Sequence, residues 1–249
     1  MRERTILSRV NDFLSQAERL GIIRTIQLRV LARLGVREIR LRVSGLEAPV
    51  LCRVQDSDIW EFNQSLGPWS EQFNLGFVPS LIVDAGANVG YASLRFKLLF
   101  PGARIIAIEP EIGNIRQFKK NCQRYSNISL VPNALWPRST RLSMVSSGGS
   151  NGFQVIEDEN GGVTATSLPE LMRTFGIEKI DLLKIDIEGG EVELFEDPGA
   201  ELWLLCVRAI LIETHDSKRP GSSEAVRNRL KDRFSYRGQV NEYELYIAQ

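Results

Sequence analysis

Apolar and polar residues follow two different patterns on either side of residue 80. Beyond that point, short apolar runs alternate with stretches of helical periodicity, which are 90–100, 112–124, 168–175, 190–196 and 222–233. Alternating strands and helices build a parallel sheet that helices cover on both faces. We therefore expect an α/β fold with a seven-stranded, mostly parallel sheet whose last two strands are antiparallel. The expected strands are 81–84, 104–108, 128–131, 180–185, 207–212, 234–238 and 243–247.

The beginning of the chain follows a different pattern. Apolar side chains recur at three- and four-residue steps through residues 1–35, which predicts helices. Residues 37–43 and 49–54 alternate apolar and polar positions around a short turn, which predicts a β-hairpin. We expect the helices to cap the main domain, with a dimerisation or membrane-surface helix as the alternative. The predicted organisation is an N-terminal helical and β-hairpin extension, 1–54, followed by one enzyme-sized domain, 55–249.

Composition and charge narrow the class of protein. The 249 residues contain 31 Lys and Arg against 31 Asp and Glu, so the net charge is zero and a general nucleic-acid binder is not favoured. The arginines between residues 19 and 42 could form a local basic face, although a solvated helix face is the simpler interpretation. Three cysteines argue against a disulfide framework, and a single histidine excludes a multi-histidine metal centre.

The sequence predicts neither a membrane span nor a secretory signal. No run of eighteen apolar residues occurs, and the N-terminus is charged from its second residue without an uninterrupted apolar segment. The cytoplasm is therefore the expected location.

The first strand after residue 80 ends in a glycine turn, Asp84-Ala85-Gly86-Ala87-Asn88-Val89-Gly90. Such a turn before a helix allows a ligand to approach the backbone closely, a role we expect of Gly86 and Gly90. Asn88 stands where a glycine is common, and asparagine tolerates a positive φ. Dinucleotide sites favour Gly-x-Gly-x-x-Gly for a pyrophosphate, whereas this turn is Gly-x-x-x-Gly and follows Asp84. A carboxylate there would repel a pyrophosphate and attract an ammonium group, so the turn favours S-adenosylmethionine over NAD.

The ends of the next two strands supply further candidate ligands for an adenosine group. Glu109, which Pro110 follows, stands 25 residues after Asp84, where an acidic residue suits the two hydroxyls of a ribose. The third strand leads to Asn133-Ala134-Leu135-Trp136, where Asn133 could pair with the adenine edge. Trp136 could stack near that edge, but packing in the core is the simpler interpretation.

One predicted strand carries charges where a central parallel strand should be apolar. The segment 181–191 reads DLLKIDIEGGE, with Lys184, Asp186 and Glu188 at every second position. In an extended chain these three side chains share one face. A buried lysine needs a partner, and Asp186 is the nearest candidate. Such a departure from the strand pattern is expected at a functional site, and an internal ion pair that only orders the strand end is the alternative.

The neighbouring strand runs into Glu213-Thr214-His215, and Glu213 and His215 share a face of it. Strand ends of one parallel sheet converge on one crevice, so we expect His215 within reach of Asp186. A lone histidine is often structural, and at this point both interpretations stay open. Oxygen atoms of Asp186, Glu188 and Glu213 could bind Mg²⁺, although the sequence does not require a metal.

These motifs together resemble the FkbM-type methyltransferases, a class I family that depends on S-adenosylmethionine. The resemblance covers residues 54–216 and rests on the motifs VDAGANVGY, IEPE, NAL, TSLPEL, LLKIDIEGGE and IETHD, of which LKIDIEG is the most specific. It implies a Rossmann-like sheet and methylation of an oxygen on a sugar or another natural product. It further implies that the turn around Gly86 holds the methionine part and that Glu109 binds the ribose hydroxyls.

The same resemblance implies that Asp186, Glu188 and His215 face the reaction crevice. An alcohol keeps its proton until it attacks, so a base should remove that proton. We expect His215 or Asp186 to be the base, with Lys184 holding the carboxylates in place.

Two other functions remain as alternatives at this stage. A nicotinamide-dependent oxidoreductase could use a similar sheet, but the missing Gly-x-Gly-x-x-Gly pattern argues against it. A non-catalytic scaffold that only binds S-adenosylmethionine is the other alternative. The presence of Glu109, Lys184, Asp186 and Glu188 together argues against a site that has lost its activity. The expected partner is a small-molecule or glycan acceptor, and a homodimer could form through the N-terminal extension.

Overall fold

The computed structural model describes residues 22–54, 57–66, 74–146 and 153–249. The chain divides into two compact units, residues 1–67 and residues 68–249, and each is described by itself. The domain boundary expected near residue 54 stays a prediction. The first of the two expected N-terminal helices lies outside the described residues.

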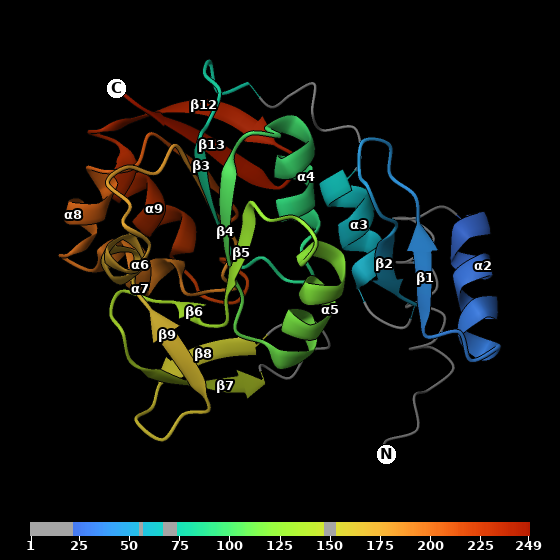
Figure 1. Cartoon of the computed structure of the whole chain (residues 1–249). Helices are drawn as coiled ribbons and strands as arrows, with labels where there is room; N and C mark the ends of the chain where they lie inside the picture. The colour runs from blue at the N-terminus through green and yellow to red at the C-terminus, as the bar shows by residue number, and fades with distance from the viewer. Residues whose placement is uncertain (1–21, 55–56, 67–73, 147–152) are drawn as a thin grey trace. The chain divides into compact units, whose positions relative to one another are not determined.

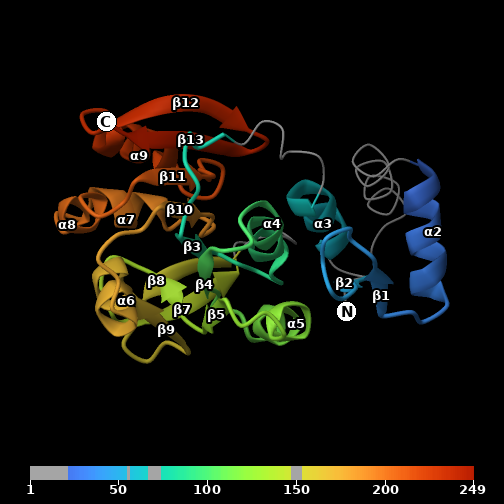
Figure 2. The same cartoon turned by 45° about the horizontal axis from the view of Figure 1, so that its top comes forward.

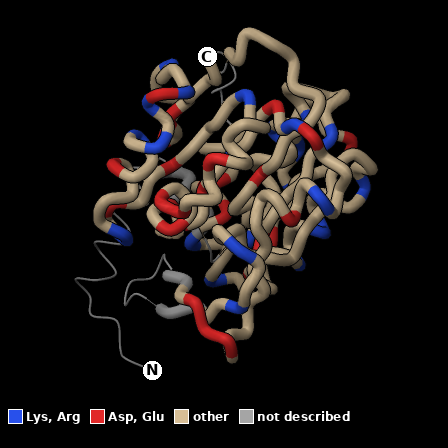
Figure 3. The backbone as a smooth tube through the Cα atoms, turned by 90° about the vertical axis from the view of Figure 1, so that its left-hand side faces the viewer, with Lys and Arg blue, Asp and Glu red and all other residues tan. Residues whose placement is uncertain are grey.

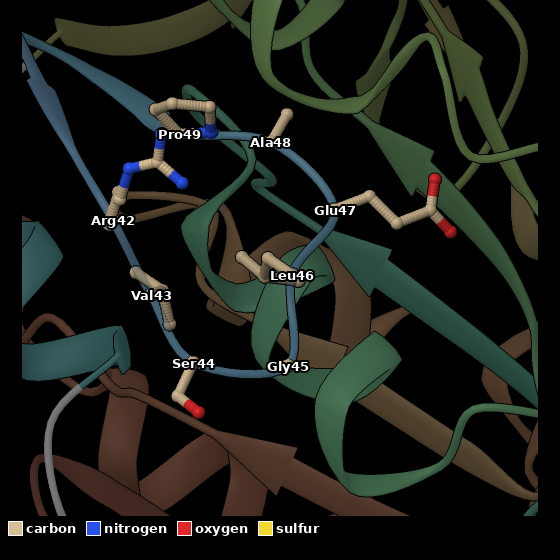
Figure 4. A pocket seen from close by; sticks show the side chains of 8 residues that line it. All are labelled: Arg42, Val43, Ser44, Gly45, Leu46, Glu47, Ala48 and Pro49. Atoms are coloured by element: carbon tan, nitrogen blue, oxygen red, sulfur yellow. The ribbon is translucent and has the colours of Figure 1, made fainter.

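The first unit contains the predicted helix and hairpin. Helix α2 (Ile22–Arg33) ends at Gly35, where φ is +78° and Val36 N donates to Leu31 O in the closing hydrogen bond. Strands β1 (Glu38–Leu41) and β2 (Val50–Arg53) pair antiparallel, which confirms the hairpin. The hairpin turn, residues 42–49, lines a hollow of about 240 Å³ (Figure 4). None of the candidate site residues lines this hollow.

A helix that the sequence analysis did not predict follows the hairpin. Helix α3 (Asp58–Leu66) begins at Asp58, a fully buried carboxylate. Its oxygens accept hydrogen bonds from Arg53 N at 2.8 Å and from the Arg53 guanidinium at 2.6–3.0 Å. This buried ion pair fixes the start of α3 to the end of β2.

The second unit is built on the expected seven-stranded sheet (Figure 1). The spatial order is β12-β13-β11-β10-β3-β4-β5, and the pairs from β11 to β5 are all parallel. Strand β13 pairs antiparallel with both β11 and β12, so the antiparallel last pair is confirmed. The strands are β3 (Leu81–Ala85), β4 (Arg104–Ile108), β5 (Ile128–Val131), β10 (Leu182–Ile185), β11 (Ala209–Ile212), β12 (Phe234–Val240) and β13 (Tyr243–Ala248).

Helices cover both faces of this sheet (Figures 1 and 2). Alternate residues of each strand point to opposite faces, so Ile82 packs in one cluster with Phe96, and Val83 in another with Phe195. Burial on both faces explains why the strands read as nearly continuous apolar runs. One side carries α4 (Tyr91–Leu99) and α5 (Ile112–Cys122), and the other carries α6 (Leu168–Phe175), α7 (Glu191–Glu196), α8 (Ala200–Leu204) and α9 (Ser222–Leu230).

A small second sheet lies between β5 and α6, where the sequence analysis named no strand. Its strands are β6 (Ala134–Leu135), β7 (Arg141–Ser146), β8 (Phe153–Glu157) and β9 (Val163–Thr166), in the order β6-β9-β7-β8. Leu142 and Ala165 of this sheet pack against Trp136. Together they form a small core of their own.

In the part of the chain that the structure describes, the helices lack the length and apolarity that a membrane crossing requires. Lys and Arg segments are interspersed with Asp and Glu segments along the tube in the view of Figure 3. That distribution agrees with the zero net charge of the sequence.

Candidate active site

The residues singled out in the sequence gather at one edge of the seven-stranded sheet. Strands β3, β4, β10 and β11 lie parallel, so the segments that follow them leave the sheet at the same edge. Strand β13 runs antiparallel to β11, and therefore its first residue, Tyr243, belongs to this edge as well. The edge thus combines side chains from five segments of the chain.

The glycine turn after β3 packs tightly against the rest of the protein. Gly86 has φ +75°, and a Cβ added to it would lie 1.7 Å from the carbonyl oxygen of Asp186. Gly90 has φ +95°, and its added Cβ would lie 2.6 Å from Cys122 Sγ. Both glycines are therefore required by protein contacts, whereas close approach of a ligand stays a prediction. Asn88 adopts the positive φ expected for it, +48°.

Glu109 is buried at the carboxyl end of β4, and its side chain contacts the glycine turn. Its Oε2 accepts a hydrogen bond from Asn88 N at 2.9 Å, and its Oε1 accepts one from Glu111 N at 2.9 Å. Burial raises the pKa of Glu109 above its usual value, although the N–H groups of Glu111 and Asn88 oppose the shift. Each carboxylate oxygen has two lone pairs, so Glu109 can accept further hydrogen bonds from hydroxyl groups.

Asp84 is fully buried and points into the protein. Its Oδ2 accepts a hydrogen bond from Ser93 Oγ at 2.6 Å, and its Oδ1 lies 3.4 Å from Lys184 Nζ. Contact of this carboxylate with an ammonium group of a ligand stays a prediction. The ammonium group beside Asp84 belongs to Lys184.

Lys184 links the two central strand ends. Its Nζ donates a 2.8 Å hydrogen bond to Gly86 O and lies 3.3 Å from Asp186 Oδ2. Burial alone would lower the pKa of Lys184, but the carboxylates of Asp186 and Asp84 outweigh this effect and raise it. The expected Lys184–Asp186 pair is present, with Asp84 as a second carboxylate.

Asp186 also accepts a hydrogen bond from the last strand. Tyr243 Oη donates to Asp186 Oδ2 at 3.0 Å. Burial acts to raise the pKa of Asp186, but the positive charges of Lys184 and His215 lower it on balance. Asp186 is consequently a weak base in this arrangement.

His215 lies at the centre of a group of carboxylates. Its Nδ1 lies 2.8 Å from Glu191 Oε1, within hydrogen-bonding distance. Its Nε2 lies 3.6 Å from an oxygen of Asp186 and 3.5 Å from an oxygen each of Glu188 and Glu213, beyond ordinary hydrogen-bond length. The structure thus brings His215 and Asp186 together.

The pKa of His215 reflects these neighbours. Burial acts to lower it, but the hydrogen bond to Glu191 and the charge of Asp186 raise it to about 8. Glu213 responds in the same direction, because burial and the charge of Asp186 raise its pKa to about 8. An excess of negative charge therefore surrounds the imidazole.

Glu188 lies near His215, but it is not part of an extended strand as the sequence pattern predicted. Strand β10 ends at Ile185, and Glu188 has φ +60°, so the extended face expected for residues 184–188 is interrupted. Its side chain is 47% exposed and forms an ion pair with Lys218.

A metal ion could contact Asp186, Glu188 and His215, because one ligand atom of each lies within 4.8 Å of the others. Ammonium groups already lie against two of these residues, Lys184 against Asp186 and Lys218 against Glu188. We therefore assign no metal to this group.

The remaining candidates belong to the segments after β4 and β5. Pro110 and Asn133 are half-buried, and Ala134 is buried in β6. Trp136 is buried, and its Nε1 donates a 2.6 Å hydrogen bond to Glu157 Oε1. Its environment agrees with packing in the core, the simpler of the two interpretations. Contact of Asn133 with an adenine stays a prediction.

Sequence reasoning missed two side chains of the site, Glu191 and Tyr243. Glu191 is completely buried, yet in the sequence it is an ordinary glutamate at the start of a helix. The pair Gly189-Gly190 before it marked a turn, but not the contact with His215. Tyr243 lies 57 residues after its partner Asp186, and the sequence gives no signal of that contact.

Comparison with known proteins identifies similar sequences. A family model described as the methyltransferase FkbM domain matches residues 84–237. Methyltransferase sdnD of Sordaria araneosa is 28% identical over 181 residues, which cover 57% of this chain and 70% of that protein. Methyltransferase 1 of Beauveria bassiana is 25% identical over 166 residues, which cover 56% of this chain and 66% of that protein. AMB antimetabolite synthetase AmbE of Pseudomonas aeruginosa is 26% identical over 214 residues, but this chain spans only 10% of its length.

Solved structures with a similar fold share little sequence. The Methanococcus jannaschii fibrillarin pre-rRNA processing protein matches 85% of this chain and 87% of its own, with 14% identity and a TM-score of 0.46. Aeropyrum pernix fibrillarin in complex with natively bound S-adenosyl-L-methionine matches 69% of this chain and 67% of its own, with 12% identity and a TM-score of 0.43. The fold is therefore assigned from the strand order of the seven-stranded sheet and not from these structures.

Proposed function

Because this chain belongs to the FkbM methyltransferase family, we propose that its S-adenosylmethionine-dependent methyl transfer goes to a hydroxyl oxygen of a small molecule, a sugar or another natural product. The observation that carries the proposal is His215, a buried imidazole whose Nε2 lies at the edge of the sheet. An amine attacks with its own lone pair once it is neutral, whereas an alcohol has a proton that a base must take. A positioned base therefore supports an oxygen acceptor.

The residues present fit S-adenosylmethionine. Glu109 accepts hydrogen bonds from Asn88 N, Glu111 N and Asn114 Nδ2 at the end of β4, and its Oε2 retains a lone pair for a ribose hydroxyl. The carboxylates of Asp186 and Glu188 suit a sulfonium, which is a cation, better than a pyrophosphate. We propose that these carboxylates, and not Asp84, lie near the positive charge of the cofactor. The family also removes the nicotinamide-dependent oxidoreductase as an alternative.

The cofactor supplies a methyl group bonded to a positively charged sulfur. In the proposed reaction the acceptor oxygen forms a bond to that carbon, the carbon–sulfur bond breaks, and its electron pair stays on sulfur. His215 Nε2 takes the hydroxyl proton, and the nearby carboxylate of Asp186, whose pKa is lowered, stabilises the imidazolium that forms. Lys184 holds the backbone of Gly86 and the side chain of Asp186 in place.

His215 is the better of the two candidate bases. Lys184 and Tyr243 already contact the Asp186 carboxylate, and the pKa of Asp186 is lowered. The pKa of His215 is raised to about 8, which lies near the pH at which a general base is most effective. We therefore propose His215 as the base, with Asp186 acting through charge.

Calorimetry with S-adenosylmethionine and S-adenosylhomocysteine tests the cofactor site. We expect binding that Glu109→Ala weakens at least about tenfold, because the ribose hydroxyls lose their acceptor. Glu178→Gln, which changes an exposed carboxylate, is the matched control and should bind as the wild type does. A folded wild-type protein that binds neither compound would refute the proposed activity.

The acceptor atom requires a separate measurement. Cofactor with a ¹³C-labelled methyl group is incubated with a panel of hydroxyl compounds and their amine analogues, and the carbon shift of the product distinguishes O-methyl from N-methyl. We expect O-methyl products, and His215→Ala should lower turnover by about 10²-fold or more with little change in cofactor affinity. Methylation of amines alone would overturn the proposed acceptor, and binding without any turnover would favour the scaffold alternative. The cytoplasmic location and a homodimer through residues 1–54 stay predictions from the sequence.

A further inference from the structure

Glu191 is the most deeply buried carboxylate beside His215, and the reaction scheme above does not use it. Its side chain is 0% exposed, in the first turn of α7. A buried charge is costly without partners. Its partners come from three segments: His215 Nδ1 lies 2.8 Å from Oε1, Gly189 N donates to Oε1 at 3.2 Å, and Ser222 Oγ lies 3.2 Å from Oε2 and 2.8 Å from Arg219 O.

This arrangement fixes the hydrogen on one nitrogen of His215. Glu191 Oε1 accepts a hydrogen bond from Gly189 N, and a hydrogen on His215 Nδ1 makes the imidazole a second donor to the same oxygen. A neutral imidazole has one N–H, and therefore its Nε2 keeps a lone pair. That lone pair lies on the side of Asp186, Glu188 and Glu213, where a proton can be received.

We propose that Glu191 is the positioning residue of the site: it holds His215 as the Nδ1–H tautomer and directs the Nε2 lone pair toward the acceptor hydroxyl. The inference rests on the proposed role of His215 as base. Glu191 touches neither cofactor nor acceptor in this scheme and acts only through the imidazole. Ser222, which is also fully buried, lies beside the second oxygen of Glu191, and Gly189 N donates to the first.

Other charged groups also act on His215, and the test must separate them from Glu191. Asp186, Glu188 and Glu213 face Nε2, while Lys184 and Lys218 partly neutralise the first two. Tyr243 of β13 donates a hydrogen bond to Asp186. Glu191 is distinguished from this set because its side chain contacts Nδ1.

The chain contains a single histidine, so nuclear magnetic resonance of ¹⁵N-histidine-labelled protein reports on His215 without an assignment problem. In the wild type we expect the Nδ1–H tautomer above the pKa of the imidazole. Glu191→Gln keeps the shape of the side chain but removes its charge, so the pKa of His215 should fall from about 8 to about 7 or below. The acid limb of the kcat/KM profile should move in the same direction.

The kinetic readout separates positioning from binding. Glu191→Gln should lower kcat about tenfold or more while KM for the acceptor and the cofactor dissociation constant stay within about twofold. Glu193→Gln is the matched control, because Glu193 lies on the same helix and pairs with Arg219 instead of His215. It should change neither the pKa of His215 nor kcat.

Two results would overturn the proposal. One is a neutral His215 with its hydrogen on Nε2 in the wild type, which decides the matter even if Glu191→Gln does not fold. The other is a folded Glu191→Gln protein with the wild-type pKa and kcat. The resonance measurement needs no methyl transfer, so failure of the proposed activity is distinguishable from failure of this inference.

Discussion

The backbone of Gly86 lies directly against the carbonyl oxygen of Asp186, so close that an added Cβ would be 1.7 Å from it. Gly86 follows β3 and Asp186 follows β10, the two paired strands at the centre of the sheet. The contact sets the distance between the glycine turn and the carboxylates, and Lys184 reinforces it by donating to Gly86 O. The two halves of the site therefore have one fixed spacing.

This contact makes Gly86 intolerant of a side chain. Gly86→Ala should lower the free energy of unfolding by about 3 kcal/mol or more, because it adds both an overlap with backbone and a strained positive φ. Gly176→Ala is the matched control: φ is +63° there, but nothing lies within 4 Å of the added Cβ. Its cost should be about 1–2 kcal/mol. Equal losses of the two variants in urea unfolding would contradict the importance of the contact.

Lys184 should be needed for stability as well as for the site. Lys184→Met leaves Asp84 buried without its counter-charge, and breaking a buried ion pair costs about 3–5 kcal/mol. Adding Asp84→Asn should restore part of the loss, because the unpaired charge is then removed. Lys179→Met, at an exposed position, should stay within about 0.5 kcal/mol of the wild type. Urea denaturation of the four proteins measures these values, and no recovery in the double variant would argue against the pairing.

Glu213 makes the stability of the protein depend on pH. Its pKa is raised in the folded state from 4.5 to about 8, so between these values the folded protein holds a proton that the unfolded chain has lost. The free energy of unfolding should therefore fall as the pH rises through this window. His215, with its pKa raised from 6.5 to about 8, adds a decrease of the same sign.

Glu213→Gln isolates the contribution of that carboxyl group. The variant should gain stability relative to the wild type as the pH rises, with little difference near pH 4.5 and the largest difference above pH 8. Urea unfolding of both proteins at the two ends of the window measures it. A difference that does not change with pH would show that Glu213 titrates normally.

Removal of metal ions should leave methyl transfer unchanged. Lys184 and Lys218 lie against Asp186 and Glu188, so these carboxylates have positive partners without a metal. Turnover is compared before and after treatment with a chelator, with Mg²⁺ added back to half of the sample. A loss that Mg²⁺ restores would instead assign a cation to the group of Asp186, Glu188 and His215.

Periodicity predicted the main sheet well, because its strands are buried on both faces and read as apolar runs. The antiparallel last pair and the resemblance to the FkbM family are confirmed as well. Helix α3 was missed because Asp58, which begins it, is buried by an ion pair with Arg53 that no local pattern reveals. The small sheet was not predicted as regular structure because strands such as β7 and β8 mix apolar and polar residues instead of forming continuous apolar runs.

Site residues could be predicted where the unusual pattern lay within one short stretch of the sequence. Lys184 and Asp186 stood out because charge interrupts a strand that should be apolar. Asp84 was assigned to a ligand because its partner, Lys184, lies 100 residues away and only the strand pairing brings them together. Glu191 and Tyr243 stayed hidden for the same reason, since their roles depend on packing between distant segments.

The pairing of β3 with β10 has a consequence for how the protein is made. Ile82 pairs with Leu182, so the centre of the sheet joins segments one hundred residues apart. Non-local pairs of this kind form slowly, and an unpaired strand edge invites association with other chains. On the ribosome, a nascent chain that has not yet emerged past β10 has Glu109 and the glycine turn, but Asp84 lacks its lysine. The candidate site is therefore complete only late in synthesis, and until then the edge of β3 that pairs with β10 has no partner strand.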